Sequence, residues 1–303
     1  MSLHDKTVLV TGATGFIGTH LVEELIAQKL KVVVLARDLT KLTFDTSHVT
    51  VIPGDITADF ELPHVDVVFH LAAFATVPHC IKDPKTALHV NTFGTVNLLE
   101  KLKDMSPRFV YASTLGVYGR TSHELVKEED RTSPVEPYAA SKLAAEHFVV
   151  AYKRAYHMNT VVARIFNCYG EGLGTHLVVH QIIDQLLHKD TVELGNTEPI
   201  RDFIYVKDVV DALIFLAEHG DEDVYNVGTG KGTSIQELAE TLATIAGKEA
   251  AITSVEHRKQ SKTVEINTSI ADISKIKTLG WKPKHLLVEG LKRTYQHYHD
   301  ITR

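Results

Sequence analysis

The residues best placed to do chemistry are a tyrosine and a lysine four positions apart, Tyr138 and Lys142. On a helix this spacing puts both side chains on one face, one above the other. An ammonium beside a phenol favours the phenolate, so we expect Lys142 to lower the pKa of Tyr138. Such a tyrosine can act as a general base at neutral pH, or as the acid in reverse. Ser113-Thr114 ends an apolar run, where hydroxyls can hydrogen-bond a reacting oxygen.

A glycine-rich loop near residue 15 predicts a dinucleotide site. Its glycines recur every third residue within 11–18, between an apolar run and an amphipathic stretch. Glycine allows a tight turn, close approach of the backbone to a pyrophosphate, and close packing of the helix on the strand. Amides at the helix N-terminus then face the anion. The loop residues expected to bind the cofactor are Gly12, Thr14, Gly15, Phe16, Ile17 and Gly18.

The end of the second apolar run bears on which nicotinamide dinucleotide would be held. NAD calls for a carboxylate there, which binds the ribose 2′-hydroxyl. Ala36 stands at that end and Arg37 follows, a pair that suits the 2′-phosphate of NADP. If the strand ended two residues later, Asp38 would be the carboxylate that NAD requires. The sequence therefore allows either cofactor and favours NADP. Asp55-Ile56, after the third run, fits the edge of the adenine pocket, although Asp55 also suits a plain turn.

Short apolar runs alternate along the chain with longer amphipathic stretches. Strands are predicted at 7–10, 31–36, 49–52, 65–71, 109–112 and 160–165. Helices are predicted at 16–28, 86–102, 138–156, 177–188 and from 233 to about 247, the last opened by a capping box at 233–236. Near-continuous apolar strands separated by helices indicate a parallel sheet covered on both faces.

This pattern predicts an α/β fold with a Rossmann-type doubly wound parallel sheet and a smaller C-terminal α/β substrate lobe. Ligands in such folds bind beyond the carboxyl ends of the strands. We expect residues 1–170 to form the nicotinamide-binding domain that carries the Tyr-Lys pair. Residues 171–303 are expected to form the substrate lobe, with crossovers to the core.

Composition narrows the class of protein further. The 303 residues carry a formal net charge of −6, which argues against a nucleic-acid-binding surface. Two cysteines exclude a disulfide scaffold and favour a reducing cytoplasm. No apolar run is long enough to cross a membrane. The 18 histidines are scattered, so we predict no metal site.

Taken in order, the motifs make the chain similar to the extended short-chain dehydrogenase/reductase family, in its nucleotide-sugar epimerase/dehydratase branch. The resemblance covers nearly the whole length. The segments that carry it are the 11–18 loop, His70-Leu71-Ala72-Ala73, Asn91-Thr92-Phe93-Gly94-Thr95, Ser113-Thr114, Tyr138 with Lys142, 164–170, 201–209, 225–228 and 279–283.

The resemblance implies a role for each of these positions. Tyr138 would be the acid/base, Lys142 would hold the nicotinamide ribose, and Thr114 would hydrogen-bond the oxygen being oxidised. Further cofactor contacts are implied for Leu71, Ala72, Ala73, Asn91, Ser113 and Tyr138 itself.

The resemblance also implies residues that hold the diphosphate of a nucleotide-sugar substrate. These are Asn167 and Arg201, with Arg258 assisting, since an arginine fork can donate two bonds to a diphosphate. Each has a plainer alternative: Asn167 could cap a turn, Arg201 could make a surface ion pair, and Arg258 could be solvated. A homodimer built from the 86–102 and 138–156 helices is also implied.

One departure from the family pattern separates the possible reactions. Sugar 4,6-dehydratases carry Asp-Glu directly after the threonine, and the related decarboxylases carry a Glu in that stretch, whereas this chain has Leu115-Gly116. Neither residue can transfer a proton.

We therefore predict a nucleotide-sugar epimerase, most simply at C4. The main alternative is an NADPH-dependent 4-keto-sugar reductase. A 4,6-dehydratase in which another residue supplies the acid, and a non-catalytic dinucleotide sensor, are less favoured. The sequence does not specify the nucleotide or the sugar. We expect the loops at 74–81, 119–133 and 170–179 to contact the substrate and to determine which one is bound.

Overall fold

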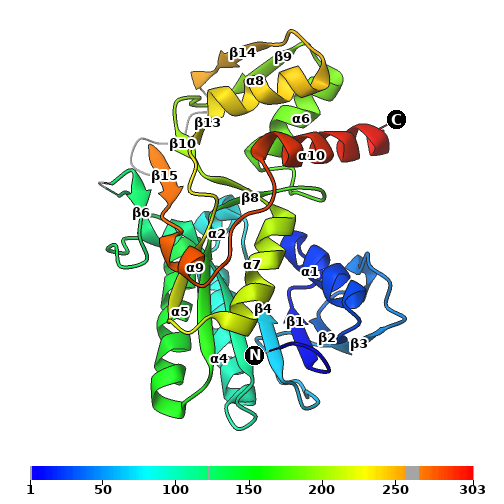
Figure 1. The fold of residues 1–303 in the computed structure, drawn as a ribbon, viewed down its shortest axis with the longest axis vertical. Coiled ribbons are helices and arrows are strands. Elements are labelled where there is room, and N and C mark those ends of the chain that lie inside the picture. Colours follow the sequence, from blue (N-terminus) through cyan, green and yellow to red (C-terminus); the bar gives the residue numbers. More distant parts are fainter. Residues whose placement is uncertain (1, 122, 257–265, 303) are drawn as a thin grey trace.

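The computed structural model describes residues 2–121, 123–256 and 266–302, and a parallel sheet of seven strands forms its centre (Figure 1). The strand order is β12-β7-β5-β4-β1-β2-β3. The order reverses between β1 and β4, the place where doubly wound sheets bind their ligands. The strands are β1 (Thr7–Thr11), β2 (Lys31–Ala36), β3 (Val49–Pro53), β4 (Val67–His70), β5 (Arg108–Thr114), β7 (Thr160–Ile165) and β12 (Val224–Val227).

The sequence of the inner strands explains why the sheet lies at the core. Every residue of β4 and β7 is buried, as expected for strands covered on both faces. The six predicted strands and the Rossmann-type class are confirmed. The seventh strand, β12, was not predicted. It extends the sheet beyond β7 in parallel register, with Tyr225 opposite Ala163.

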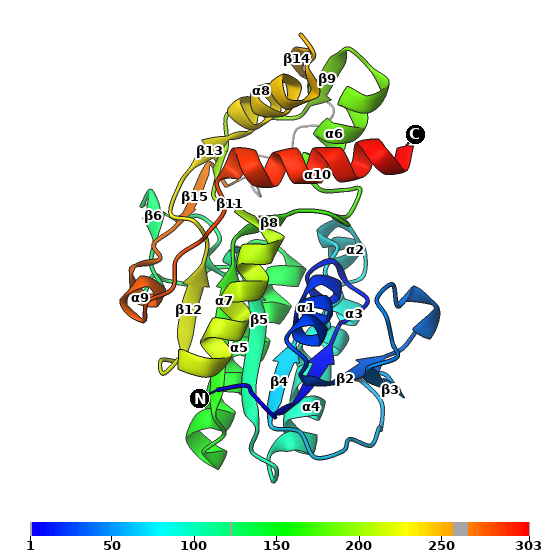
Figure 2. The same cartoon turned by 45° about the vertical axis from the view of Figure 1, so that its right-hand side comes forward.

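Helices cover both faces of the sheet. On one face α1 (Phe16–Ala27) packs against α7 (Val206–His219), and on the other α4 (Gly94–Leu102) packs against α5 (Pro137–Tyr156) (Figure 2). Both α5 and α7 contact β5 and β7. The predicted helices at 16–28 and 138–156 are confirmed to within one residue at each end, whereas α7 was not predicted.

The stretch predicted to be helical over 86–102 is helical throughout, but a π-helical turn interrupts it. The structure has α3 (Pro84–Leu88), a π-helical turn at His89–Phe93, and then α4. The wider turn directs Asn91 inward, where its Nδ2 donates to the carbonyl oxygen of Phe74 and to Ser141 Oγ. A tertiary contact therefore sets the helical geometry locally, as is common for such turns.

The second lobe lies above the carboxyl ends of the sheet strands (Figure 1). Its helices α6 (Val178–His188), α8 (Ile235–Ala246) and α10 (Leu287–Thr302) pack together. The capping box of α8 is formed by Ser234 and Glu237, one residue later than predicted, because Ser234 is the N-cap. The remaining described α-helices and strands are α2 (Val77–Lys82), α9 (Ser274–Thr278), β6 (Leu125–Val126), β8 (Asn167–Tyr169), β9 (Thr191–Leu194), β10 (Ile200–Arg201), β11 (Phe203–Tyr205), β13 (Thr233–Ser234), β14 (Ala251–Ser254) and β15 (Thr268–Ala271), and two 3₁₀ helices span Leu39–Lys41 and Leu115–Tyr118.

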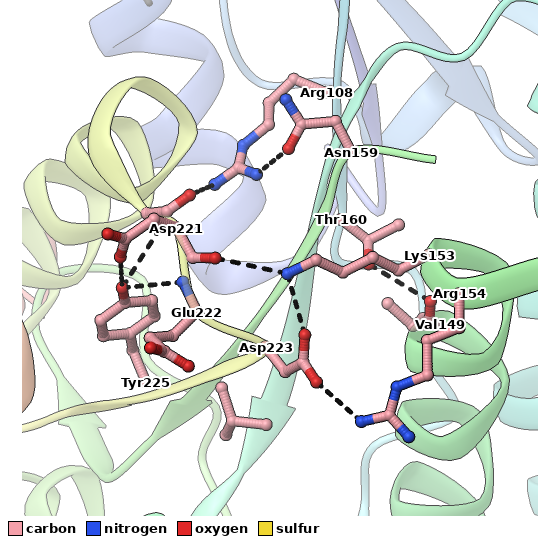
Figure 3. Close-up of polar contacts among 12 residues, drawn as sticks. Arg108, Val149, Lys153, Arg154, Asn159, Thr160, Asp221, Glu222, Asp223 and Tyr225 are labelled. Atoms are coloured by element: carbon pink, nitrogen blue, oxygen red, sulfur yellow. Dashed lines mark hydrogen bonds and ion pairs between the residues drawn. The ribbon is translucent and has the colours of Figure 1, made fainter. Parts of the chain in front are cut away.

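Chain beyond residue 170 returns to the large sheet as α7 and β12. Polar contacts at the amino ends of β5 and β7 hold this crossover in place (Figure 3). Arg108 Nη2 donates to two carbonyl oxygens at the end of α7, each at 2.6 Å. Lys153 Nζ lies 2.8 Å from the carboxylate of Asp223, directly before β12. The division into two domains at residue 170 stays a prediction.

Candidate active site

A cleft of about 1360 Å³ runs along the carboxyl ends of the sheet strands, where the strand order reverses, and reaches the second lobe. Nearly all of the site residues predicted from the sequence line it. Arg258 lies outside the described residues. The predicted residues that line the cleft are Gly12, Thr14, Gly15, Phe16, Ile17, Gly18, Arg37, Asp55, Ile56, Leu71, Ala72, Ala73, Ser113, Thr114, Tyr138, Lys142, Asn167 and Arg201.

The glycine loop has the geometry that a pyrophosphate needs. Gly12 has a φ of +76°, and a Cβ there would lie 2.5 Å from the amide nitrogen of Ala72. A Cβ on Gly18 would lie 2.1 Å from the carbonyl oxygen of Gly12. The helix α1 begins after Gly15, and no side chain caps it. Its first amides therefore face the cleft as donors for an anion, so these residues fit a dinucleotide.

The far end of the cleft is formed by the turn after β2. The strand ends at Ala36, as predicted. The side chain of Arg37 is 70% exposed, and its Nη1 lies 3.4 Å from Asp55 Oδ2. Asp38 accepts from the amide of Thr40 at 3.1 Å. The hydroxyl and amide of Thr40 hold the pKa of the Asp38 carboxyl below its ordinary value. The Asp38 carboxylate is therefore bound by groups of its own turn, and this contact competes with any hydrogen bond to a ribose.

Tyr138 lies in the first turn of α5, and Lys142 lies one turn later. The side chain of Lys142 is buried, and its Nζ sits 4.1 Å from the centroid of the Tyr111 ring. Burial lowers the pKa of Lys142 to about 7, partly offset by the carboxylate of Glu146 one turn further on. An ammonium stacked on an aromatic face gains a cation–π contact that offsets part of its lost hydration.

The pKa of Tyr138 is raised, not lowered as the sequence predicted. Burial is the largest cause, and Glu136 and Cys80 add to it. Lys142 does not lower it, because burial favours the neutral amine and its nitrogen faces the Tyr111 ring. The phenol is therefore held protonated in this structure, and a positive charge brought into the cleft would be needed to favour the phenolate.

Two hydroxyls at the end of β5 complete the centre of the site. Thr114 Oγ1 accepts from the amide of Gly116 at 3.2 Å, which leaves its own proton available to a further partner. Ser113 Oγ donates to the carboxylate of Glu146, which also pairs with Arg164 at 2.8 Å. Ser113 is thus anchored to a buried ion pair below the cleft.

His70 and Asn91 lie beneath the cleft. The ring nitrogens of His70 contact the hydroxyls of Thr11 at 2.6 Å and Thr95 at 2.8 Å. Burial lowers the pKa of His70 to about 3, so the ring is neutral. Asn91, expected among the cofactor contacts, is fully buried and does not line the cleft. Its side-chain oxygen accepts from the amide of Phe74 at 2.7 Å, so it supports the segment that leads into α2.

Asn167 and Arg201 line the end of the cleft nearest the second lobe. Asn167 Nδ2 donates to the carbonyl oxygen of Asp202 at 3.1 Å, and Arg201 Nη1 donates to the carbonyl oxygen of Ile200 at 2.9 Å. The buried carboxylate of Asp202 accepts from the amides of Thr229 and Gly230, which ties the nearby loop down. Sequence reasoning missed Asp202, although it directly follows Arg201.

Glu136 also lines the cleft and was missed. It is the N-cap of α5, and its two carboxylate oxygens accept from the amides of Tyr138 and Ala139, each at 2.7 Å. The sequence contained a signal for this role, because a carboxylate followed by proline is a common start for a helix.

Among the described residues no cluster of three or more His, Cys, Asp or Glu side chains could hold a metal. Nor is any described helix both long and apolar enough to span a bilayer.

Comparisons with known proteins agree with this geometry. The family model described as GDP-mannose 4,6 dehydratase matches residues 9–294. The GDP-6-deoxy-D-mannose reductase of Pseudomonas aeruginosa is 34% identical over 301 residues, with 95% of each chain covered. The structure of UDP-glucose 4-epimerase from Thermotoga maritima with UDP-glucose is 31% identical, with a TM-score of 0.89, covering 98% of this chain and 100% of that one. The structure of UDP-glucuronic acid 4-epimerase from Bacillus cereus with UDP-glucuronic acid and NAD is 30% identical, with a TM-score of 0.88, covering 97% and 99%.

Proposed function

Because the chain belongs to the extended short-chain dehydrogenase/reductase family of NAD(P)-dependent nucleotide-sugar epimerases, reductases and dehydratases, we propose that it is a nucleotide-sugar 4-epimerase. A bound nicotinamide supplies the acceptor and donor of a hydride. Tyr138 takes the proton of the C4 hydroxyl and later returns it. Thr114 hydrogen-bonds the reacting oxygen, and Lys142 holds the nicotinamide ribose. The 4-keto sugar turns over in the cleft before it is reduced on its other face.

The observation that carries the proposal is the pair of residues after Thr114. Leu115 and Gly116 line the cleft together with Tyr138, in the stretch where dehydratases and decarboxylases hold acids. Elimination of water and loss of carbon dioxide both need a proton transfer beyond the one that Tyr138 performs. Glu136 also lines this part of the cleft, but both of its carboxylate oxygens accept from amides at the start of α5. Tyr138 as the one acid/base suits an oxidation followed by a reduction at one carbon.

We propose NADP rather than NAD as the preferred cofactor. Arg37 and Lys41 both line the cleft beyond β2, and both are cations that favour a 2′-phosphate. Asp38, the one carboxylate within two residues of Ala36, is engaged by Thr40. Asp55 and Asp38 line the same end of the cleft, 3.4 Å from Arg37 and Lys41 respectively, so the charges balance there. The preference for NADP therefore rests on Arg37, which directly follows Ala36 and is 70% exposed.

A second candidate is an NADPH-dependent 4-keto-sugar reductase. It uses the same Tyr138 and Lys142, and the Pseudomonas aeruginosa relative is a reductase by name. The preference for NADP favours it, because a net reduction consumes an exchangeable cofactor. An epimerase instead regenerates its cofactor in each cycle.

We also propose a homodimer in the cytoplasm. Three apolar side chains on the face formed by α3, the π-helical turn and α5 are exposed: Leu88 at 57%, Phe93 at 50% and Phe148 at 44%. Such a face suits a second copy of the chain, because apolar surface gains free energy when it is removed from water. Cys80 and Cys168 are free thiols, which suits a reducing compartment. Sedimentation of wild type against Phe93→Glu would test the dimer.

Incubation with UDP-, GDP-, dTDP- and CDP-sugars, without added reductant, tests the reaction. A product of unchanged mass with C4 inverted, identified by NMR, is the expected result. Loss of water would overturn the assignment to an epimerase. Absence of conversion, together with NADPH-dependent reduction of a 4-keto sugar, would establish the second candidate instead.

A further inference from the structure

The part of the cleft around Tyr138 holds a single carboxylate, Glu136. Three segments build this part: 72–81, 112–116 and 135–142. Among their described residues that line the cleft, Glu136 and Lys142 are the only side chains that commonly carry a charge. This inference rests on the proposed function, which places the sugar here, against Tyr138 and Thr114.

The position of the Glu136 carboxylate is fixed from both oxygens. Oε2 accepts from the amide of Tyr138 and Oε1 from the amide of Ala139, each at 2.7 Å. These amides lie at the N-terminus of α5, which spans Pro137–Tyr156 and favours a negative charge at its start. Burial raises the pKa of Glu136, and the two amides work against that shift. The carboxylate is therefore held rigidly as a charge, two residues before the acid/base.

The apolar side chains around Glu136 allow its negative charge to act on a substrate that it does not touch. Val77, Pro78, Ile81, Leu115 and Val135 also line this part of the cleft, so it is largely apolar. In such surroundings charges are screened less than in water. Among the described residues of these three segments that line the cleft, Lys142 is the one cation, and it is buried with its nitrogen over the Tyr111 ring. It faces the floor of the site, where the proposed mechanism uses it to hold the ribose.

We propose that Glu136 is a specificity-determining residue that restricts the enzyme to nucleotide sugars with an uncharged C6, and rejects the corresponding uronic acids. In a uronic acid C6 is a carboxylate carbon, bonded to C5, which is the ring neighbour of C4. Turnover at C4 would bring that carboxylate into the apolar pocket with Glu136. Like charges placed together across an interface strongly disfavour the wrong partner.

The test compares matched pairs of substrates that differ only at C6: UDP-glucose with UDP-glucuronic acid, and GDP-mannose with GDP-mannuronic acid. For the nucleotide that is turned over, the wild type is expected to favour the neutral sugar by about tenfold or more in kcat/KM. Glu136→Gln should narrow that ratio by about tenfold, chiefly by improving the uronic acid. The accompanying change in the pKa of Tyr138 acts on both substrates and cancels in the ratio.

Two further variants keep the test decisive. Glu136→Ser retains a side-chain oxygen suited to an N-cap without the charge, and it should narrow the ratio as Gln does even if the Gln variant folds poorly. Asp83→Asn is the matched control: Asp83 also caps a helix, accepting from the amide of Thr86 at 3.1 Å, but it does not line the cleft. It should leave the ratio unchanged.

The outcomes distinguish this inference from the proposed function. Equal turnover of both members of a pair by the wild type, or an unchanged ratio in the Gln and Ser variants, would overturn the role of Glu136 and leave the epimerase intact. No inversion at C4 in any neutral nucleotide sugar would overturn the proposed function itself.

Discussion

The nitrogen of Lys142, one helical turn after the residue that we assign as the acid/base, lies over the face of the Tyr111 ring, 4.1 Å from its centroid. The contact explains how a lysine can be carried into the interior of a sheet protein. Burial nevertheless lowers the pKa of Lys142 to about 7, because the contact offsets only part of the lost hydration. Lys142 therefore changes its protonation near neutral pH.

This titration predicts a pH-dependent stability. The unfolded chain keeps the Lys142 proton to about pH 10, whereas the folded protein releases it near pH 7. Between these values the unfolded state binds more protons, so stability rises with pH, and the cost of burying the charge applies in full only below pH 7. From pH 7 to 9 the free energy of unfolding of wild type should rise by about 2 kcal/mol relative to Lys142→Met. Urea unfolding of both proteins at each pH measures this, and a difference that does not vary with pH would contradict it.

Removal of the Tyr138 hydroxyl should abolish most of the activity without disturbing the fold. Tyr138→Phe is expected to lower kcat by about 10²–10⁴-fold, the range for loss of a general acid/base. Cofactor binding should remain within a few-fold of wild type, because Tyr138 is part-buried at the cleft wall and the glycine loop is untouched. Retention of most of the activity on the true substrate would show that another group moves the proton.

Arg37 should control the choice of cofactor. Its side chain is largely exposed and makes one long contact with Asp55, so its replacement costs the fold little. Arg37→Ala should weaken NADP binding by about tenfold, one lost charge-assisted contact, and leave NAD binding within about twofold. Titration calorimetry with each dinucleotide measures this, with Lys31→Ala as a control at the opposite end of β2. An equal loss for both cofactors would remove the case for NADP.

Two glycines of the same loop should respond differently to a methyl group. A Cβ on Gly18 meets the carbonyl oxygen of Gly12 at 2.1 Å, whereas one on Gly15 meets the same oxygen at 3.2 Å. Gly18→Ala should therefore lose about 1–3 kcal/mol of stability together with cofactor binding, while Gly15→Ala should remain close to wild type in stability. Thermal unfolding in the absence and presence of NADP separates the two effects. Equal stability of the two variants would be inconsistent with the described loop.

The sequence was most informative where local chemistry decides the structure. The glycine loop, the end of β2 at Ala36 and the position of Tyr138 in the first turn of α5 all follow from spacing and residue type. Each is set by contacts within a few residues, so a single segment contains the information.

What could not be predicted depends on distant partners. The π-helical turn at His89–Phe93 depends on Asn91 reaching Phe74 and Ser141, from two other parts of the chain. The raised pKa of Tyr138 and the near-neutral pKa of Lys142 follow from burial, which spacing does not report. The apolar residues of α7, among them Val209, Val210 and Leu213, do recur at helical spacing, so that helix could have been recognised.

The position of β12 also has a consequence for the synthesis of the protein. The sheet needs residues 224–227 to cover the edge of β7, so a nascent chain must hold six strands with an open edge while residues 166–223 are made, which takes several seconds at ordinary rates of translation. Unpaired strand edges attract other strands. We therefore expect ribosome-bound chains from which β7 has emerged but residues 224–227 have not to aggregate or recruit chaperones. Chains in which residues 224–227 have also emerged should be the first that bury their own edge.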